Sequence, residues 1–335
     1  LFTELIDIDF NVRTNNKTPK QQESVKRNEI NGTVCLFSGG VDSVAGIISE
    51  SVKNNYPTIG LYISYNQIGG VIKKERELLS SWKIPNLKDI YTLKIKRGAS
   101  SVQHVRGFVF TSLGILVASA LGYKNLVISE IGPVMFQPIY NILDEVTITT
   151  HPYTLEMSKR IMAILIDSSV EIKTPFDEKT KAEIVHDLLK NSPGGRKETE
   201  RLLLMTHSCR RSNFANANRH CGYCLGCVIR HSAFILNGIE DENSKDYERD
   251  VWGIEKIENG GNNKYNSQII KHTLDNLLPL LEFSRSILLM TGNNDHPIGY
   301  AKVKQFNREE LFKRFSLEIL STLHKYYGEE GKGSN

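Results

Sequence analysis

The residues best suited to chemistry include one run of six small and polar positions, Ser38-Gly39-Gly40-Val41-Asp42-Ser43. The run follows an apolar stretch at residues 34–37 and precedes a helix-like segment. A strand, a glycine turn and a helix start make a cradle for an anion, because glycine lets the backbone approach closely and the first N–H groups of a helix are free. We interpret the run as a phosphate-binding loop; the plain alternative is an ordinary glycine turn.

Three side chains of this loop narrow the choice of ligand. Ser38 and Ser43 add hydroxyl donors, and the carboxylate of Asp42 is a ligand type that Mg2+ accepts. Walker-type phosphate loops end in Gly-Lys-Ser/Thr, and that lysine is missing here. The loop therefore favours ATP as the ligand, cleaved at a different position from the Walker-type reaction.

A second group with clear chemistry is a cysteine quartet with the spacing C-x11-C-x2-C-x2-C: Cys209, Cys221, Cys224 and Cys227. Four thiolates in a tight segment suit tetrahedral Zn2+ in a closed structural site. The two-residue gaps let successive sulfurs turn back onto one ion, and Gly222 and Gly226 relieve the turns. An iron–sulfur cluster and four free thiols are the alternatives.

The remaining cysteine and the nearby histidines are not expected to be ligands. Cys35 falls in the first apolar stretch, where a cysteine is commonly a small buried residue. His207, His220 and His231 flank the quartet, but four thiolates already fill a tetrahedral shell. We expect these histidines beside the site or on the surface.

Composition places the chain among soluble proteins. Its 335 residues are 40% hydrophobic and 24% charged, which suits one large or two smaller domains. The formal charge of +4 is compatible with phosphate ligands and argues against direct nucleic-acid binding. No apolar run reaches the roughly 18–20 residues that span a bilayer, and the absence of a secretory pattern favours the cytoplasm. Leu1 is not an initiator methionine, so the start of the natural chain stays open.

Short β-branched runs alternate with helical stretches from residue 34 on. The predicted strands are residues 34–37, 59–64, 89–95, 125–129 and 170–172. This alternation predicts an α/β fold with a parallel sheet and helices on both faces. Ligands bind beyond the carboxyl ends of such strands, which points to the loop at 38–43, to residues 64–66, to residues 129–132 and to the segment after Ile172.

Two helices can be placed in more detail. The clearer one covers residues 105–121 and ends at Gly122, and helical spacing assigns its apolar face to Val105, Phe108, Val109, Leu113, Leu116, Val117 and Ala120. The other starts after Thr180, because Thr180 and Glu183 have the spacing of a capping box. Lys181 then lies in the first turn, where it either reaches a phosphate or is an ordinary solvated lysine.

Three regions are expected along the chain. Residues 1–31 are polar and form an N-terminal arm. Residues 32–240 form the α/β domain, with the cysteine knuckle at 209–227. Residues 241–335 form a mainly helical C-terminal extension, because apolar helical runs occur near 268–290 and 309–326.

The loop resembles the signature of the PP-loop ATP pyrophosphatases. With the cysteine quartet added, the chain resembles the 7-cyano-7-deazaguanine synthase (QueC) family over residues 33–240. Further pieces of the resemblance are Arg106 followed by Phe108; Pro175 followed by Thr180-Lys181-Ala182-Glu183-Ile184-Val185; and Ser208-Cys209 with the run from Cys221 through Arg230 to Ile239.

This resemblance implies a PP-loop fold that cleaves ATP between its α and β phosphates, with Mg2+ as a cofactor and Zn2+ in the knuckle. The residues that would bind ATP are Ser38, Gly39, Gly40, Val41, Asp42, Ser43 and Ser64. Asp42, Arg106 and Lys181 would serve catalysis, the last two by steadying negative charge. A solvated arginine is the plain alternative for Arg106.

One segment departs from the family pattern. The family's substrate-facing Asp-Cys-Arg element is absent from residues 129–138. Glu130 and Gly132 are the candidates for substrate contacts; the plain alternative for Glu130 is a solvated carboxylate at a loop start. With its altered segment and extended tail, the chain resembles QueC-like proteins of bacterial anti-phage operons of the Qat and CBASS types.

The resemblance implies adenylation of a 7-deazaguanine carboxylate and transfer to an amine. Ammonia would give 7-amido- and then 7-cyano-7-deazaguanine, whereas a protein amine would give a deazaguanine–protein conjugate. Two alternatives stay open, namely a PP-loop enzyme that modifies tRNA directly and a non-catalytic nucleotide-binding scaffold. An operon-encoded protein partner and a homodimer are further options that the sequence does not decide.

Overall fold

The computed structural model describes residues 30–64, 70–95, 106–136, 149–209, 220–222, 224–240, 247, 277–285, 287–288 and 308–330. Several predictions therefore lie outside the described residues. They concern the N-terminal arm up to residue 29, residues 65–66, Val105, residues 137–138 and most of the region 241–276.

The described residues form one parallel sheet of five strands in the order β3-β2-β1-β4-β5. The strands are β1 (Ile30–Leu36), β2 (Thr58–Ser64), β3 (Leu87–Lys94), β4 (Tyr123–Val127) and β5 (Glu171–Lys173). Each overlaps a predicted strand, so the parallel α/β fold is confirmed. In the central register, Val34 of β1 pairs with Ile59 of β2 and with Leu126 of β4.

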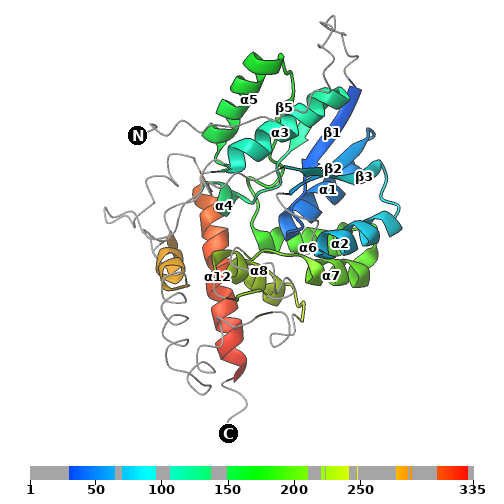
Figure 1. The fold of residues 1–335 in the computed structure, drawn as a ribbon. Coiled ribbons are helices and arrows are strands. Elements are labelled where there is room, and N and C mark those ends of the chain that lie inside the picture. The colour runs from blue at the N-terminus through cyan, green and yellow to red at the C-terminus, as the bar shows by residue number, and fades with distance from the viewer. Residues whose placement is uncertain are drawn as a thin grey trace, which may run out of the picture.

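Helices cover both faces of the sheet, as predicted. One layer holds α1 (Val41–Lys53), α2 (Gly70–Ser81), α6 (Lys181–Asn191) and α7 (Gly195–Met205), and the other holds α3 (Arg106–Leu121) and α5 (Pro152–Ile166) (Figure 1). This division follows from right-handed crossovers, because the chain moves from β1 towards β3 and then returns to β4 on the other side of β1. The reversal places a crevice for ligands at the carboxyl ends of β1 and β4.

The predicted apolar face of α3 is correct only in part, because Leu113 and Val117 pack half-buried against the core while other members of that face do not. The buried residues of this helix are Thr111, Gly114, Ile115 and Ala118, whereas Leu116 is 44% exposed. Large apolar residues occur on most sides of α3, so their spacing does not mark the core face. Small residues mark it instead, because a Cβ on Gly114 would lie 2.7 Å from Leu126 and 3.1 Å from Leu36. The helix therefore lies directly on β1 and β4. Its end at Gly122 is as predicted, with φ of +72°.

The C-terminal part of the described chain is helical and packs on the α/β unit. Helix α12 (Glu309–Glu330) runs beside α8 (Leu225–Leu236), and Figure 1 shows the two in contact next to α4 (Gly132–Met135). Phe312 and Phe315 of α12 are completely buried, and the hydroxyls of Ser232 and Thr322 lie 2.6 Å apart across the interface. Among the described helices, none is both long and apolar enough to cross a membrane.

Candidate active site and metal centre

Lys181 and Asp42 meet at the carboxyl edge of the sheet. The Nζ atom of Lys181 donates hydrogen bonds to Oδ1 and Oδ2 of Asp42, each at 2.7 Å. Asp42 is the second residue of α1 and Lys181 the first residue of α6, and the two helices pack together. The Lys181 side chain is only 8% exposed, which excludes the solvated-lysine alternative. A buried ion pair contributes little net stability, so function is the better explanation for this one.

A capping box determines where α6 starts. The hydroxyl of Thr180 accepts a hydrogen bond from the Glu183 N–H at 3.3 Å, and the Glu183 carboxylate accepts one from the Thr180 N–H at 3.0 Å. The predicted capping box is thus confirmed. Because it fixes the first turn of the helix, it also fixes the position from which Lys181 reaches Asp42.

The glycine loop is shaped for an anion. Helix α1 begins after Gly40, and no side chain caps it, so its first N–H groups remain available. Gly39 has φ of +76°, a conformation that glycine adopts without strain. The Ser43 hydroxyl donates to the Gly40 carbonyl at 2.9 Å, and the Ser38 hydroxyl donates to Ser43 at 3.2 Å. The Gly40 N–H donates to the Ser38 hydroxyl at 3.4 Å, so the loop is held from within, while no side chain caps the first N–H groups of α1.

A buried carboxyl lies directly behind this loop. Glu75 of α2 is fully buried, and neither of its carboxyl oxygens has a hydrogen-bond partner among the described residues. A Cβ built on Gly39 would lie 2.8 Å from Oε2 of Glu75 and 2.4 Å from Ile72. Burial raises the pKa of Glu75 to about 9, so the side chain is neutral at neutral pH. Sequence reasoning missed this residue because its neighbours in the chain are charged and resemble a solvated helix face.

Ser129 belongs to the segment 129–132 that the strand pattern predicts beside the site. Ser129 follows β4 and is 6% exposed, and its hydroxyl has no hydrogen-bond partner in the described part of the chain. Its Oγ would lie 1.8 Å from a Cβ on Gly46 of α1, so glycine is required where the two segments touch. Ser64, the predicted ATP contact at the end of β2, is also buried.

The structure does not bring every predicted residue to the Lys181–Asp42 pair. Arg106 begins α3 with an exposed side chain and makes no ion pair with Asp42 in the described structure. Glu130 is half-buried beyond β4. Gly132 is buried, and its N–H donates to the carbonyls of residues 176 and 179 at 3.0 and 3.2 Å. The catalytic role of Arg106 and the substrate roles of Glu130 and Gly132 stay predictions.

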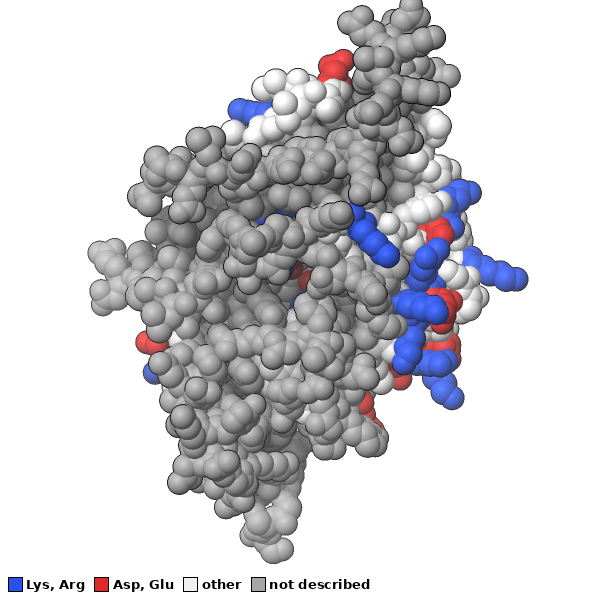
Figure 2. All heavy atoms as spheres, in the orientation of Figure 1, with Lys and Arg blue, Asp and Glu red and all other residues white. Residues whose placement is uncertain are grey.

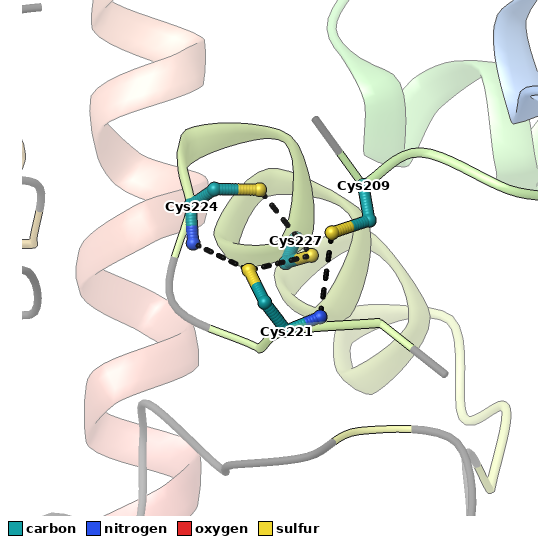
Figure 3. Close-up of side chains that lie close together, drawn as sticks. All are labelled: Cys209, Cys221, Cys224 and Cys227. Atoms are coloured by element: carbon teal, nitrogen blue, oxygen red, sulfur yellow. Dashed lines mark hydrogen bonds between the residues drawn. The ribbon is translucent and has the colours of Figure 1, made fainter. Parts of the chain in front are cut away.

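The four cysteine sulfurs converge on one point (Figure 3). All lie within 4.8 Å of one another, and Sγ of Cys227 is 3.8 Å from that of Cys221 and 3.4 Å from that of Cys224. A tetrahedral zinc site with bonds of about 2.3 Å would place its sulfurs about 3.8 Å apart. Backbone N–H groups of Cys221 and Cys224 also donate to the sulfurs of Cys209 and Cys221, both at 3.3 Å. The cluster therefore fits a tetrahedral thiolate-bound metal.

Hydrogen bonds in the knuckle favour the thiolate form of Cys209, which is the form that binds a metal. Hydrogen bonds from Cys221, Cys224 and Cys227 hold the pKa of the Cys209 thiol far below its usual value, because a thiolate is the better acceptor. Arg230 is completely buried nearby, with its guanidinium 4.2 Å from the centre of the Phe234 ring. Its guanidinium donates hydrogen bonds to the Tyr247 hydroxyl and to the Leu203 carbonyl, which hold this buried charge.

The histidines around the knuckle are packing partners rather than surface groups. His220 and His231 are 5% and 3% exposed, so the prediction that they lie beside the site is confirmed and the surface option is wrong. His207 stacks on His220 with ring centres 4.8 Å apart, and His231 stacks on Tyr247 at 4.9 Å. Aromatic stacking thus builds one face of the knuckle.

The knuckle and the glycine loop are directly connected. The backbone N–H of His207 donates to the Gly39 carbonyl at 2.8 Å, and His207 is two residues before Cys209. A Cβ on Gly226 would lie 2.4 Å from the Ser208 carbonyl, so the start of α8 packs against the same short segment. Metal binding at Cys209 would therefore also fix the backbone that supports Gly39.

The sheet, the glycine loop and the cysteine knuckle define a parallel α/β protein with a loop shaped for an anion and a four-cysteine cluster that could hold a metal. Residues 96–238 match the family model described as Queuosine biosynthesis protein QueC. The 7-cyano-7-deazaguanine synthase of Rhizobium rhizogenes is 40% identical over 86 residues, which cover 25% of this chain and 30% of that protein. The synthase of Brucella ovis is 36% identical over 85 residues, covering 25% and 31%.

These matches span under a third of the length of either relative. The chain is QueC-like over the region that the family model matches. That region contains Arg106, Lys181 and the four cysteines, whereas the loop at 38–43 and helix α12 lie outside it.

Proposed function

We propose that the chain binds ATP on the loop at 38–43 and uses it to activate the carboxylate of a 7-deazaguanine, as an ATP-dependent carbon–nitrogen ligase. The observation that carries the proposal is the ion pair of Lys181 with Asp42, which joins the QueC-like region to the loop. The name shared by the curated relatives supplies the substrate class.

In this reaction, the substrate carboxylate oxygen attacks the α-phosphorus of ATP, the bond from that phosphorus to the α–β bridging oxygen breaks, and pyrophosphate leaves. The free N–H groups at the start of α1 bind the phosphates. The Asp42 carboxylate would hold Mg2+, which when bound offsets phosphate charge. Lys181 neutralises the charge that develops on the leaving pyrophosphate or on the acyl adenylate, so its contribution is positioning and electrostatics.

An amine then attacks the acyl carbon, and AMP leaves with the pair of electrons from the broken C–O bond. Ammonia gives an amide, and a second activation of the amide oxygen gives the nitrile. A protein amine gives a deazaguanine–protein conjugate instead. The altered segment 129–138 and the C-terminal extension are the features that keep the protein acceptor as an option, and they are also the features by which the chain resembles QueC-like proteins of anti-phage defence operons.

The proposed zinc site is structural rather than catalytic. The cysteine knuckle would hold Zn2+ with four protein ligands, which leaves no open position for a substrate. Its effect on catalysis is indirect, because the backbone N–H of His207, close to the knuckle, donates a hydrogen bond to the Gly39 carbonyl of the loop.

Direct action on tRNA receives less support. Figure 2 shows acidic side chains among the basic ones on the described part of one face. Among the described residues, Arg76 pairs with Asp89 at 2.6 Å and Arg196 with Glu200 at 2.8 Å. Binding to a nucleic acid backbone depends on basic groups that are free to meet phosphates.

The test of the proposal is product analysis. The protein is incubated with ATP, Mg2+ and 7-carboxy-7-deazaguanine, with and without ammonium, and the products are analysed by mass spectrometry. An amide or nitrile mass that depends on ammonium supports synthase-like chemistry. Pyrophosphate without either product supports an acyl adenylate that awaits a protein amine, and AMP then appears only as water hydrolyses that adenylate back to the carboxylate. The absence of both pyrophosphate and AMP under both conditions contradicts the proposal.

A further inference from the structure

Helix α12 lies outside the QueC-like region, yet its side chains form hydrogen bonds with the segment that carries Lys181. We propose that α12 is a working part of the catalytic unit, in which Arg314 and Glu318 are positioning residues that hold residues 177–183 and so keep Lys181 at the glycine loop. The inference rests on the proposed function and extends it to a helix that the family match does not cover.

Arg314 of α12 forms hydrogen bonds with the capping box of α6 and with the turn before it. Its Nε donates to Oε1 of Glu183 at 2.7 Å, and its Nη2 donates to the Glu178 carbonyl at 2.8 Å. The other carboxylate oxygen of Glu183 accepts from the Thr180 N–H. One guanidinium therefore connects the turn before α6 with the first turn of α6, and Lys181 lies between the two points.

Glu318 holds the residue next to Lys181. The Thr180 hydroxyl donates to the Glu318 carboxyl, and Thr180 is completely buried. Burial raises the pKa of Glu318 to about 8, so this carboxyl has been removed from water at a cost. A leucine would pack at this position without that cost, which makes the contact with Thr180 the better explanation for a carboxyl here.

The first turn of α12 reaches the neighbouring strand end. Leu311 lies against Gly132, where a Cβ would be 2.5 Å from its side chain. Arg308, which directly precedes α12, lies over the Phe136 ring at 5.0 Å and forms ion pairs with Asp177 and Glu178. The helix therefore contacts both segments beyond β4 and β5, at the edge where the site lies.

Docking of α12 is separate from these polar contacts. Phe312, Phe315 and Ile319 are buried in the common core, and their burial can keep the helix in place when a polar side chain is removed. Variants of Arg314 and Glu318 can therefore test positioning without detaching the helix. Lys313 is exposed on the same helix and supplies a matched control.

The test compares Arg314→Met, Glu318→Leu and the control Lys313→Met, each alone and combined with Lys181→Met. Misplacement of a catalytic group by about 1 Å can cost about a hundredfold in rate, so we expect kcat for AMP formation to fall by about ten- to hundredfold in the first two. KM for ATP should change far less. Arg314→Lys and Glu318→Gln should recover part of the rate. In the Lys181→Met background, the same changes should have an effect of under about twofold, because the group that they position is gone.

A measurement that does not depend on catalysis tests this inference independently of the proposed function. Hydrogen exchange of the amides of residues 181–184 should become at least about tenfold faster in Arg314→Met, and unchanged in Lys313→Met. If the wild-type protein releases neither pyrophosphate nor AMP, the proposed function fails, and hydrogen exchange alone decides the inference. Full activity and unchanged exchange in both Arg314→Met and Glu318→Leu would overturn it, as would losses that simply add to that of Lys181→Met. If Arg314→Met does not fold, Arg314→Lys and Glu318→Leu decide.

Discussion

The Nζ atom of Lys181 lies 2.7 Å from both carboxylate oxygens of Asp42, although the two residues are 139 positions apart in the chain. The contact joins the first turn of α6 to the first turn of α1. The same two helix starts are where the sequence predicts an ATP-binding loop and a phosphate-directed lysine. The ion pair is thus the geometric centre of the proposed site.

Removing Asp42 alone should destabilise the folded chain, whereas removing Lys181 as well should reverse most of that loss. We expect Asp42→Asn to lower the free energy of unfolding by about 3 kcal/mol, because it leaves the buried Lys181 ammonium without its partner. Adding Lys181→Met to Asp42→Asn should restore most of this loss. Urea unfolding of the two single variants and the double variant measures the coupling. Additive losses would show that the pair is not coupled in solution.

Loss of zinc should weaken ATP binding. Cys227→Ser removes one of four converging sulfurs, so we expect a chain without bound zinc and a KM for ATP raised by about tenfold, the equivalent of about 1.4 kcal/mol. The reason is that Cys209 lies two residues after His207, whose backbone N–H donates a hydrogen bond to the Gly39 carbonyl of the loop. Metal analysis by mass spectrometry and ATP titration check both effects. Cys35→Ala is the control, because Cys35 is buried in β1 away from the knuckle. An unchanged KM in a zinc-free chain contradicts the connection.

Gly39 should tolerate no side chain. Gly39→Ala places a Cβ 2.4 Å from Ile72 in a left-handed conformation, so we expect both strain and a displaced loop. Gly195→Ala is the matched control, since Gly195 has φ of +72° with open space around its Cβ position. Both variants should lose about 1–2 kcal/mol from the backbone conformation. Only Gly39→Ala should also lower ATP affinity, by more than about tenfold in calorimetry. Equal ATP affinities in the two variants would count against the assignment of the loop.

Glu75 should make stability depend on pH. Its pKa in the folded chain is about 9, against a usual value of 4.5. Below pH 4.5 both states hold the proton, so the contribution is fully present there. Above it the unfolded chain releases the proton first, and stability falls until about pH 9, by about 1.4 kcal/mol per pH unit.

Glu75→Gln should remove this slope. Between pH 5.5 and 7.5, the wild type should lose about 3 kcal/mol relative to this variant. Glu77→Gln changes an exposed carboxylate on the same helix and should keep the wild-type slope. Urea unfolding at the two pH values measures the difference, and identical slopes for Glu75→Gln and wild type would show that Glu75 is ionised in the folded protein.

Much of the sheet and part of the site could be predicted from local sequence. Short β-branched runs alternate with helices, and parallel strands place all of their carboxyl ends at one edge, so the loop at 38–43 and the start of the helix with Lys181 could be expected at the same edge. The capping box of Thr180 and Glu183 is also a local signal. Neither inference requires knowledge of distant contacts.

The remaining features depend on tertiary packing that local patterns do not encode. Leu116 has the helical spacing of a core residue, but small residues such as Gly114 decide which face of α3 meets the sheet. Glu75 belongs to a highly charged stretch and is nevertheless buried behind Gly39. The contacts of Arg314 and Glu318 join residues more than 130 positions apart, so no local pattern could have placed them.

The most direct measurement of the central claim is the exchange of labelled pyrophosphate into ATP, with and without 7-carboxy-7-deazaguanine. We predict exchange only when the carboxylate substrate is present, because adenylation is reversible while no amine is available. Lys181→Met should reduce the exchange rate, and Lys190→Met, on the exposed face of the same helix, should not. No exchange with this substrate, or conversion of ATP to ADP and phosphate, would contradict cleavage between the α and β phosphates at this site.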